Sequence, residues 1–207
     1  MILKTIISPR AENYWKIENS FQMKRYILAG TPGVGKTTLL RAFDDLGYPV
    51  VEEAATDLIT RHYTHGAAEP WKRPAFIDNI VKLQKERQLE APDKAGDVQF
   101  HDRAVVCTYA LAQYLGFDIS DVLMEEINRT VSENVFERDV FFIRPLGFCI
   151  PTDVRTINYD ETLKFEKIHE AAYEKFGYNL VSIEKNPVDT RVEDILKHVG
   201  LAAAAAN

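Results

Sequence analysis

The chain has 207 residues, a net charge of −6, and 46% of its residues in the hydrophobic set. That share supports a packed core, and the ordinary content of 10 Gly and 9 Pro excludes collagen-like and low-complexity chains. With 31 acidic against 25 basic side chains, the protein as a whole has no attraction to nucleic acids or anionic membranes. We therefore expect a globular protein whose partners include neither of them.

Two further features concern the compartment. No stretch approaches the roughly 18 apolar residues that a membrane span requires, and charge and Pro interrupt residues 1–10 too early for a signal peptide. Cys107 and Cys149 lie far apart without metal-type spacing, which disfavours a disulfide framework or a zinc site. These features favour a reducing, cytoplasmic location.

Along the chain, short apolar runs alternate with helical patterns. Residues 1–22 show no sustained pattern and are expected to form an arm. The apolar runs predict five strands, at 24–29, 48–51, 98–101, 139–143 and 180–183. Helical spacing predicts helices at 36–46, 54–63, 75–90, 105–115, 121–131, 161–176 and 188–199. Prolines and glycines mark two loops, at 65–74 and 144–159, and the second of these is a candidate lid.

This alternation is typical of a parallel sheet with helices on both faces. It predicts an α/β fold in three layers with a five-stranded sheet. No internal repeat or linker divides the pattern, so we expect one domain over residues 23–199, preceded by the arm and followed by a tail at 200–207.

The strongest chemical signal lies between the first predicted strand and the next helix. The sequence GTPGVGKT, residues 30–37, fits the phosphate-loop pattern GxxxxGK[ST] at every fixed position. Glycines let several backbone N–H groups converge on an anion, and the helix N-terminus adds positive potential. A plain glycine-rich turn is the alternative. The expected nucleotide contacts are Gly30, Thr31, Pro32, Gly33, Val34, Gly35, Lys36, Thr37 and Thr38, with Asn186 and Pro187 bordering the nucleobase.

Within this loop, Lys36 is expected to reach the β- and γ-phosphates of ATP, and the Thr37 hydroxyl to bind Mg²⁺. GTP stays possible, although the NKxD guanine motif of switch GTPases is absent from the sequence. The third predicted strand ends in Asp102 and Arg103 instead of the Asp-Glu pair of many hydrolysing ATPases. This ending favours transfer of the γ-phosphoryl group to a small molecule over its transfer to water.

Charged residues follow the predicted strands at the edge where α/β sheets bind ligands. Asp102 can hold Mg²⁺ through water or orient an acceptor hydroxyl, and Arg103 can clamp a phosphate. Alternatively, the two are a helix cap and its solvated neighbour. Glu53, slightly preferred over Glu52, can accept the proton of a substrate hydroxyl or bind a sugar or base.

Weaker candidates come from loops. Arg155 can close over the transferred phosphoryl group, and Arg144 is a less favoured alternative. Trp71 can line an acceptor pocket, although a packed surface tryptophan is the preferred interpretation. His169 lacks metal-ligand spacing with the other histidines.

Four segments together resemble the AAA-type P-loop proteins related to the ribosylnicotinamide kinase domain. They are GTPGVGKTTLL at 30–40, VEEAA at 51–55, HDR at 101–103, and the segment from PTDVR to NPVDTRVEDIL at 151–196. The resemblance covers roughly residues 23–199 and implies ATP binding, Mg²⁺ and the strand order 2-3-1-4-5. Thymidylate and deoxynucleoside kinases have a similar Asp-Arg placement. In the family another Asp often follows Asp-Arg, whereas this chain has Cys107 there.

These residues predict a Mg²⁺-dependent kinase, or kinase-like ATPase, that acts on a nucleoside-like small molecule. The expected catalytic residues are Lys36, Asp102, Arg103, Arg155 and Glu53, and the expected metal ligands are Thr37 and Asp102. One alternative is a regulatory switch that binds ATP or GTP, hydrolyses it slowly and signals to a protein partner. A scaffold with a purely structural loop is a weaker third possibility.

Overall fold

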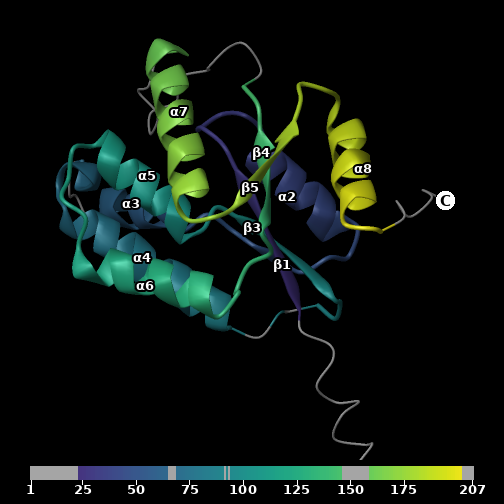
Figure 1. Ribbon diagram of the computed structural model, residues 1–207, viewed down its shortest axis with the longest axis horizontal. Coiled ribbons are helices and arrows are strands. Elements are labelled where there is room, and N and C mark those ends of the chain that lie inside the picture. The colour runs from purple at the N-terminus through teal and green to yellow at the C-terminus, as the bar shows by residue number, and fades with distance from the viewer. Residues whose placement is uncertain (1–22, 65–68, 91, 93, 146–158, 202–207) are drawn as a thin grey trace, which may run out of the picture.

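A five-stranded parallel sheet forms the centre of the described part of the chain (Figure 1), with strand order β2-β3-β1-β4-β5. This computed structural model describes residues 23–64, 69–90, 92, 94–145 and 159–201. The strands are β1 (Lys24–Ala29), β2 (Val50–Val51), β3 (Val98–Asp102), β4 (Asp139–Ile143) and β5 (Asn179–Ile183). The predicted α/β fold class and the strand order are confirmed.

Helices connect the strands. They are α2 (Lys36–Asp45), α3 (Ala54–Thr64), α4 (Ala75–Leu89), α5 (Val105–Tyr114), α6 (Asp121–Ser132), α7 (Tyr159–Lys175) and α8 (Val188–His198), with a short 3₁₀ helix η1 (Pro70–Lys72) ahead of α4. None of the helices in the described ranges is long and apolar enough to cross a membrane. The domain limits stay a prediction, because the arm at 1–22 and most of the tail lie outside the described residues.

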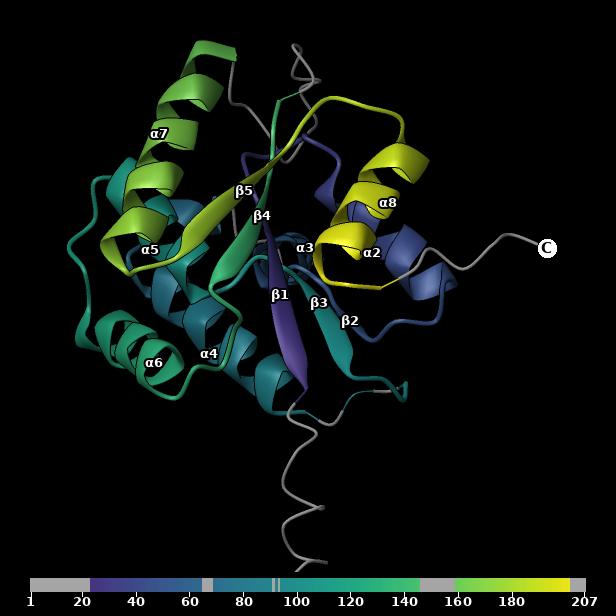
Figure 2. The ribbon, with the colours of Figure 1, turned by 45° about the vertical axis from the view of Figure 1, so that its right-hand side comes forward.

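The helices form two layers around the sheet (Figure 2): α2 and α8 cover one face, and α4 to α7 cover the other. The alternation of side chains along β1 explains why both faces are apolar. Tyr26 and Leu28 pack in the core beneath α2 and α8, whereas Ile27 and Ala29 pack in the core beneath α5 and α7. The strands whose ends carry the site therefore belong to a sheet that is covered by apolar packing on both faces.

The second strand is shorter than the apolar run at 48–51 predicts. The Tyr48 N–H donates to Phe43 O at 3.0 Å, so this residue still belongs to the turn that ends α2. Pro49 has no N–H to give to a neighbouring strand, although its carbonyl accepts from Phe100 N–H at 3.0 Å. The ladder with β3 therefore begins only at Val50.

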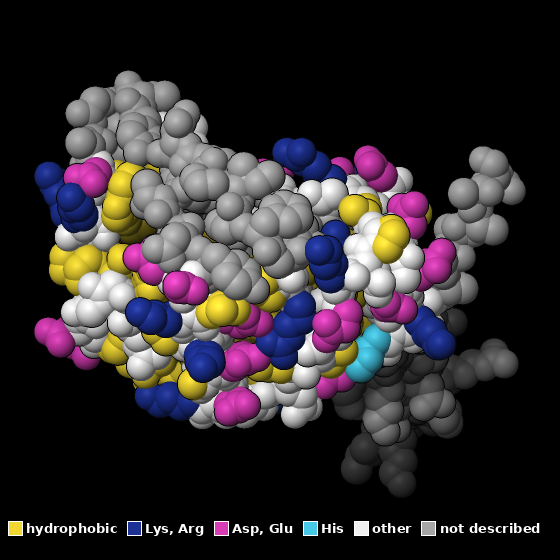
Figure 3. Space-filling model, turned by 90° about the horizontal axis from the view of Figure 1, so that it is seen from above, with side chains coloured by type: hydrophobic (Ala, Val, Ile, Leu, Met, Phe, Trp, Pro, Cys, Tyr) yellow, Lys and Arg dark blue, Asp and Glu magenta, His cyan; other side chains and the backbone are white. Residues whose placement is uncertain are grey.

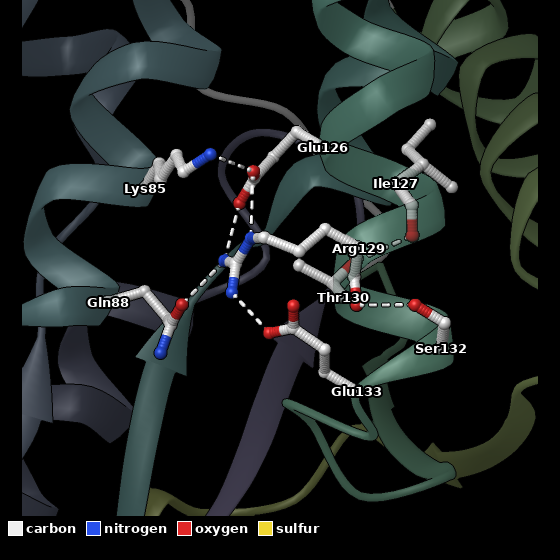
Figure 4. A network of polar contacts seen from close by, with 8 residues as sticks. All are labelled: Lys85, Gln88, Glu126, Ile127, Arg129, Thr130, Ser132 and Glu133. Carbon is white, nitrogen blue, oxygen red and sulfur yellow. Dashed lines mark hydrogen bonds and ion pairs between the residues drawn. The ribbon is translucent and has the colours of Figure 1, made fainter.

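A network of polar contacts joins α4 to α6 (Figure 4). The carboxylate of Glu126, only 5% exposed, pairs with Arg129 at 2.6 Å and with Lys85 at 3.1 Å. Arg129 also donates to Gln88 at 2.6 Å and to Glu133 at 3.0 Å. Because both charges of the central pair have partners, the network anchors the second half of α4, whose first half lines a cleft described below.

Candidate functional site

The phosphate loop lies between β1 and α2 and depends on three glycines with positive φ. Gly30 has φ 126°, and a Cβ there would come within 2.6 Å of the Ile143 carbonyl oxygen on the neighbouring strand β4. Gly33 and Gly35 have φ of 88° and 93°, in the left-handed region that side chains disfavour. The loop therefore has the tight path that brings backbone N–H groups together, and α2 begins directly after it at Lys36.

The Lys36 side chain curls back over this loop. Its Nζ donates to the carbonyl oxygens of Gly30 at 3.1 Å and of Thr31 at 2.9 Å, and the residue is only 5% exposed. Burial, reinforced by the nearby charge of Arg103, lowers the pKa of Lys36 to about 8. Among the described residues, no carboxylate forms an ion pair with the Lys36 ammonium group. An anion held by the loop would therefore favour its charged form.

Thr37 and Asp102 meet at the end of β3. The Thr37 hydroxyl donates to Asp102 Oδ2 at 3.0 Å, and Asp102 is 3% exposed. Its other oxygen, Oδ1, is buried without a hydrogen-bond partner among the described residues, and burial raises the pKa of the carboxyl group. A hydroxyl and an incompletely satisfied carboxylate fit Mg²⁺, which prefers oxygen ligands and keeps several waters or phosphate oxygens.

Arg103 and Glu53 form an ion pair in which Arg103 Nε lies 2.7 Å from Glu53 Oε1. Arg103 has φ 73°, and its N–H donates to Leu28 O at 3.1 Å, so the backbone turns sharply at the end of β3. Glu53 Oε2 accepts from the Thr56 hydroxyl at 2.8 Å. Burial disfavours the charge of Arg103, but Glu53, Cys107, Asp102 and Tyr173 together outweigh this effect, and the pKa of Arg103 is raised.

His169 of α7 supports the same arginine. Its Nδ1 lies 3.0 Å from Phe165 O, so Nδ1 carries the proton and Nε2 is left to accept from Arg103 Nη1 at 3.5 Å. His169 is fully buried, and burial followed by the Arg103 charge lowers its pKa to about 3. Sequence reasoning missed this contact, because no local pattern places α7 against the end of β3.

Two clefts open beside these residues. The first, the phosphate cleft, has a volume of about 440 Å³ and is lined by Gly33, Gly35, Lys36, Thr37, Thr38, Leu40, Arg41, Glu52, Glu53, Thr56, Asp57 and Asp102. The second, the apolar cleft, has a volume of about 310 Å³. Among its lining residues are Pro32, Ala55, Ile59, Trp71, Phe76, Ile80, Gln84, Arg103, Cys107, Thr108, Leu111, Tyr114, Glu161 and Phe165. Glu53 and Thr56 line both, so the carboxylate of Glu53 lies where the clefts adjoin.

Both clefts lie at the edge of the sheet where the parallel strands end, and Figure 3 views the molecule from above this edge. On the visible described surface, basic and acidic side chains are interspersed with hydrophobic ones, without a large field of one sign. Among the described residues that line the two clefts, the positive charge comes from Lys36, Arg41 and Arg103.

Several predicted residues lie apart from this cluster. Arg155 belongs to the stretch 146–158, outside the described residues. Asn186 and Pro187 are exposed and line neither cleft. Arg144 pairs with Glu166 at 2.8 Å and with Glu170, both of α7, and its guanidinium lies over the ring of Phe142 on β4.

Trp71 is a packed tryptophan, as the preferred interpretation of its loop states. It is half-buried, packs beside the core formed by Ala54, Phe76 and Ile80, and lines the apolar cleft. The contacts of η1 with α3 and α4 hold it there, and the composition of the loop does not reveal them. Thr108 and Gln84, also in this cleft and joined by a 2.8 Å hydrogen bond, carry no sequence signal of their own.

A family model described as AAA domain matches residues 25–191 of this chain. No curated protein sequence matches it significantly. Among solved structures, NadR protein in complex with NAD and AMP-PNP aligns with a TM-score of 0.63 and 14% identity, over 89% of this chain and 51% of that one. The chain thus spans about half the length of that structure.

Two more solved structures have a TM-score of 0.51. Deoxyadenosine kinase from M. mycoides aligns at 15% identity over 85% of this chain and 98% of its own. Thymidylate kinase from Candida albicans aligns at 10% identity over 86% of this chain and 92% of its own. At such identities the likeness establishes the shared fold.

Proposed function

Since this chain belongs to the AAA domain family, we propose that it is a Mg²⁺-dependent kinase that transfers the γ-phosphoryl group of ATP to a hydroxyl of a nucleoside-like molecule. The observation that carries this proposal is the ion pair between Glu53 and Arg103 at the junction of the phosphate cleft and the apolar cleft. In this proposal the carboxylate of Glu53 and the guanidinium group of Arg103 lie between the phosphates of ATP and the ring of the acceptor.

The phosphate cleft supplies the donors for ATP. Lys36 moves from the carbonyls of Gly30 and Thr31 to the β- and γ-phosphates, and the N-terminus of α2 adds its positive potential. Thr37 and Asp102 would hold Mg²⁺, which neutralises phosphate charge when bound. GTP is an alternative nucleotide, since the described residues include no pattern that selects adenine.

The lining of the apolar cleft favours an uncharged acceptor. Its walls are mainly aromatic and aliphatic, and Arg103 is the single basic residue among its described lining residues. The charge of Arg103 is already opposed by Glu53, and Glu161 adds a second carboxylate. A phosphorylated or carboxylated acceptor would therefore be repelled, whereas a neutral ring with a sugar hydroxyl fits.

In the proposed reaction, the acceptor hydroxyl oxygen bonds to the γ-phosphorus while the bond to the β-phosphate oxygen breaks, and ADP leaves with the electron pair. The hydroxyl proton passes to Glu53. Arg103, held by Glu53 and His169, stabilises charge on the transferred group, and Arg155 is our candidate for a further arginine closing over it.

The test is a phosphotransfer assay. The protein is incubated with Mg²⁺, γ-labelled ATP and a panel of neutral nucleosides and nucleoside monophosphates. We expect label on at least one nucleoside and none on the monophosphates. Label appearing only as inorganic phosphate, slowly and irrespective of the acceptor, would instead support the regulatory switch.

A further inference from the structure

The guanidinium group of Arg191 lies behind the phosphate loop. Arg191 belongs to the first turns of α8 and is 4% exposed. Its Nη1 donates to Val34 O at 3.2 Å, and a Cβ on Gly35 would lie 3.4 Å from both Nη atoms. Arg191 is thus packed flat against the segment Val34–Gly35, although 157 positions separate it from Val34.

The contact with Arg191 also sets the direction of the Gly35 N–H. Val34 and Gly35 are joined by a trans peptide bond, in which C=O and N–H point in opposite directions. Arg191 draws the carbonyl of this unit toward α8. The Gly35 N–H must then point away from α8, toward the side on which Gly35 and Lys36 line the phosphate cleft.

Among the described residues Arg191 forms no ion pair, so no carboxylate balances its charge, and its buried Nε has no hydrogen-bond partner. Burial lowers the pKa of Arg191, and no neighbouring charge opposes this effect. A buried charge without a counter-ion is destabilising, so the position of Arg191 directly behind the phosphate loop points to a bound anion as its partner.

We propose that Arg191 is a positioning residue for the nucleotide phosphates. It holds the Val34–Gly35 peptide with its N–H toward the phosphates, and it adds a buried positive charge behind the loop to that of Lys36. The proposal rests on the proposed nucleotide binding and concerns how tightly the same site holds its anion.

The experiment compares the wild type with Arg191→Met, Arg191→Lys and the control Lys197→Met, which removes an exposed charge from the same helix. Calorimetry gives the Kd for Mg²⁺-ATP and for inorganic tripolyphosphate, and thermal unfolding gives the Tm without ligand. Arg191→Met should raise both Kd values by roughly ten-fold or more, the loss expected for a charge-assisted hydrogen bond. The Kd values of Arg191→Lys should lie between those of the wild type and of Arg191→Met, and the Kd values of Lys197→Met should equal those of the wild type.

The Tm without ligand separates positioning from plain structural support. Because Arg191→Met removes an unpaired buried charge, its ligand-free Tm should equal or exceed that of the wild type. A lower Tm together with unchanged Kd values would overturn the proposal, as would a loss of affinity for ATP without a loss for tripolyphosphate, which would place Arg191 at the nucleobase. Failure of the wild type to bind either ligand would overturn the proposed nucleotide site itself, and the wild type alone would reveal it.

Discussion

Glu53 and Arg103 come from the ends of two neighbouring strands, β2 and β3, and their charged groups meet at 2.7 Å with side chains only 17% and 10% exposed. The backbone enforces this meeting, since Arg103 has a left-handed conformation and donates its N–H to Leu28. His169 then fixes the far end of the guanidinium group. The resulting chain of contacts links α7, β3 and β2 at the junction of the two clefts.

We predict that Glu53→Gln lowers kcat for phosphorylation of the acceptor by roughly 10²- to 10⁴-fold, because the amide cannot take the hydroxyl proton. The KM for ATP should change little, since Lys36 and the loop remain. Steady-state kinetics with a labelled acceptor measures both. Glu86→Gln, an exposed change on α4, is the matched control, and equal kcat values for the two variants would remove Glu53 from the mechanism.

Replacement of Lys36 by Met should abolish the rise in Tm that Mg²⁺-ATP produces, because the γ-phosphate loses its main cation. Lys36→Ala should likewise abolish ATP turnover. Differential scanning fluorimetry with and without nucleotide reports the first effect. Lys82→Met, on the exposed side of α4, should keep the full shift. A Lys36→Met protein that still gains stability with ATP would contradict the site.

Thr37→Ala should weaken the Mg²⁺ dependence of the reaction, whereas Thr37→Ser should preserve it, because only the hydroxyl is needed. We expect the Mg²⁺ concentration for half-maximal rate to rise by roughly ten-fold or more in the Ala variant. A Mg²⁺ titration at saturating ATP measures this. Identical titrations for the Ala and Ser variants would show that Thr37 serves only its hydrogen bond to Asp102.

The stability of the protein should fall in acid through His169. Its pKa is lowered from 6.5 to about 3 in the folded state, so the unfolded state binds the proton more readily. The contribution of the neutral imidazole is therefore complete above pH 6.5 and is lost as the pH falls toward 3, by up to about 1.4 kcal/mol per pH unit. His169→Gln keeps an acceptor for Arg103 but cannot titrate.

Denaturant unfolding at several pH values below 6.5 tests this. The curve of unfolding free energy against pH should be shallower for His169→Gln than for the wild type. His101, whose pKa burial also lowers to about 3, remains in both proteins and cancels in the comparison. Parallel curves would show that His169 takes no part in the acid response.

A larger side chain on α3 would fill part of the apolar cleft. Ala55→Phe should raise the KM for the acceptor while leaving the KM for ATP unchanged, because Ala55 lines only the apolar cleft among the two described. Ala75→Phe, at the exposed start of α4, provides the control for added bulk. A rise in the KM for ATP alone would place the acceptor elsewhere.

The local chemistry of the phosphate loop was predictable from sequence. Its glycines, Lys36 and Thr37 act within one strand-to-helix turn, so their spacing alone places them on the same loop. The alternation of strands and helices likewise predicted the α/β class, because burial on both faces gives the strands continuous apolar runs. The start of β2 was misjudged because Tyr48 bonds backward to Phe43 and Pro49 lacks a donor.

Only the tertiary structure decided the contacts between distant segments. The packing of α7 over the sheet brings His169 to Arg103, and the packing of α8 brings Arg191 to the carbonyl of Val34. The packing of η1 against α3 and α4 places Trp71 in the wall of the apolar cleft. These contacts depend on the relative placement of whole elements, which one-dimensional spacing does not record. The sequence by itself therefore determined a P-loop α/β protein, and packing decided how the two clefts share the Glu53–Arg103 pair.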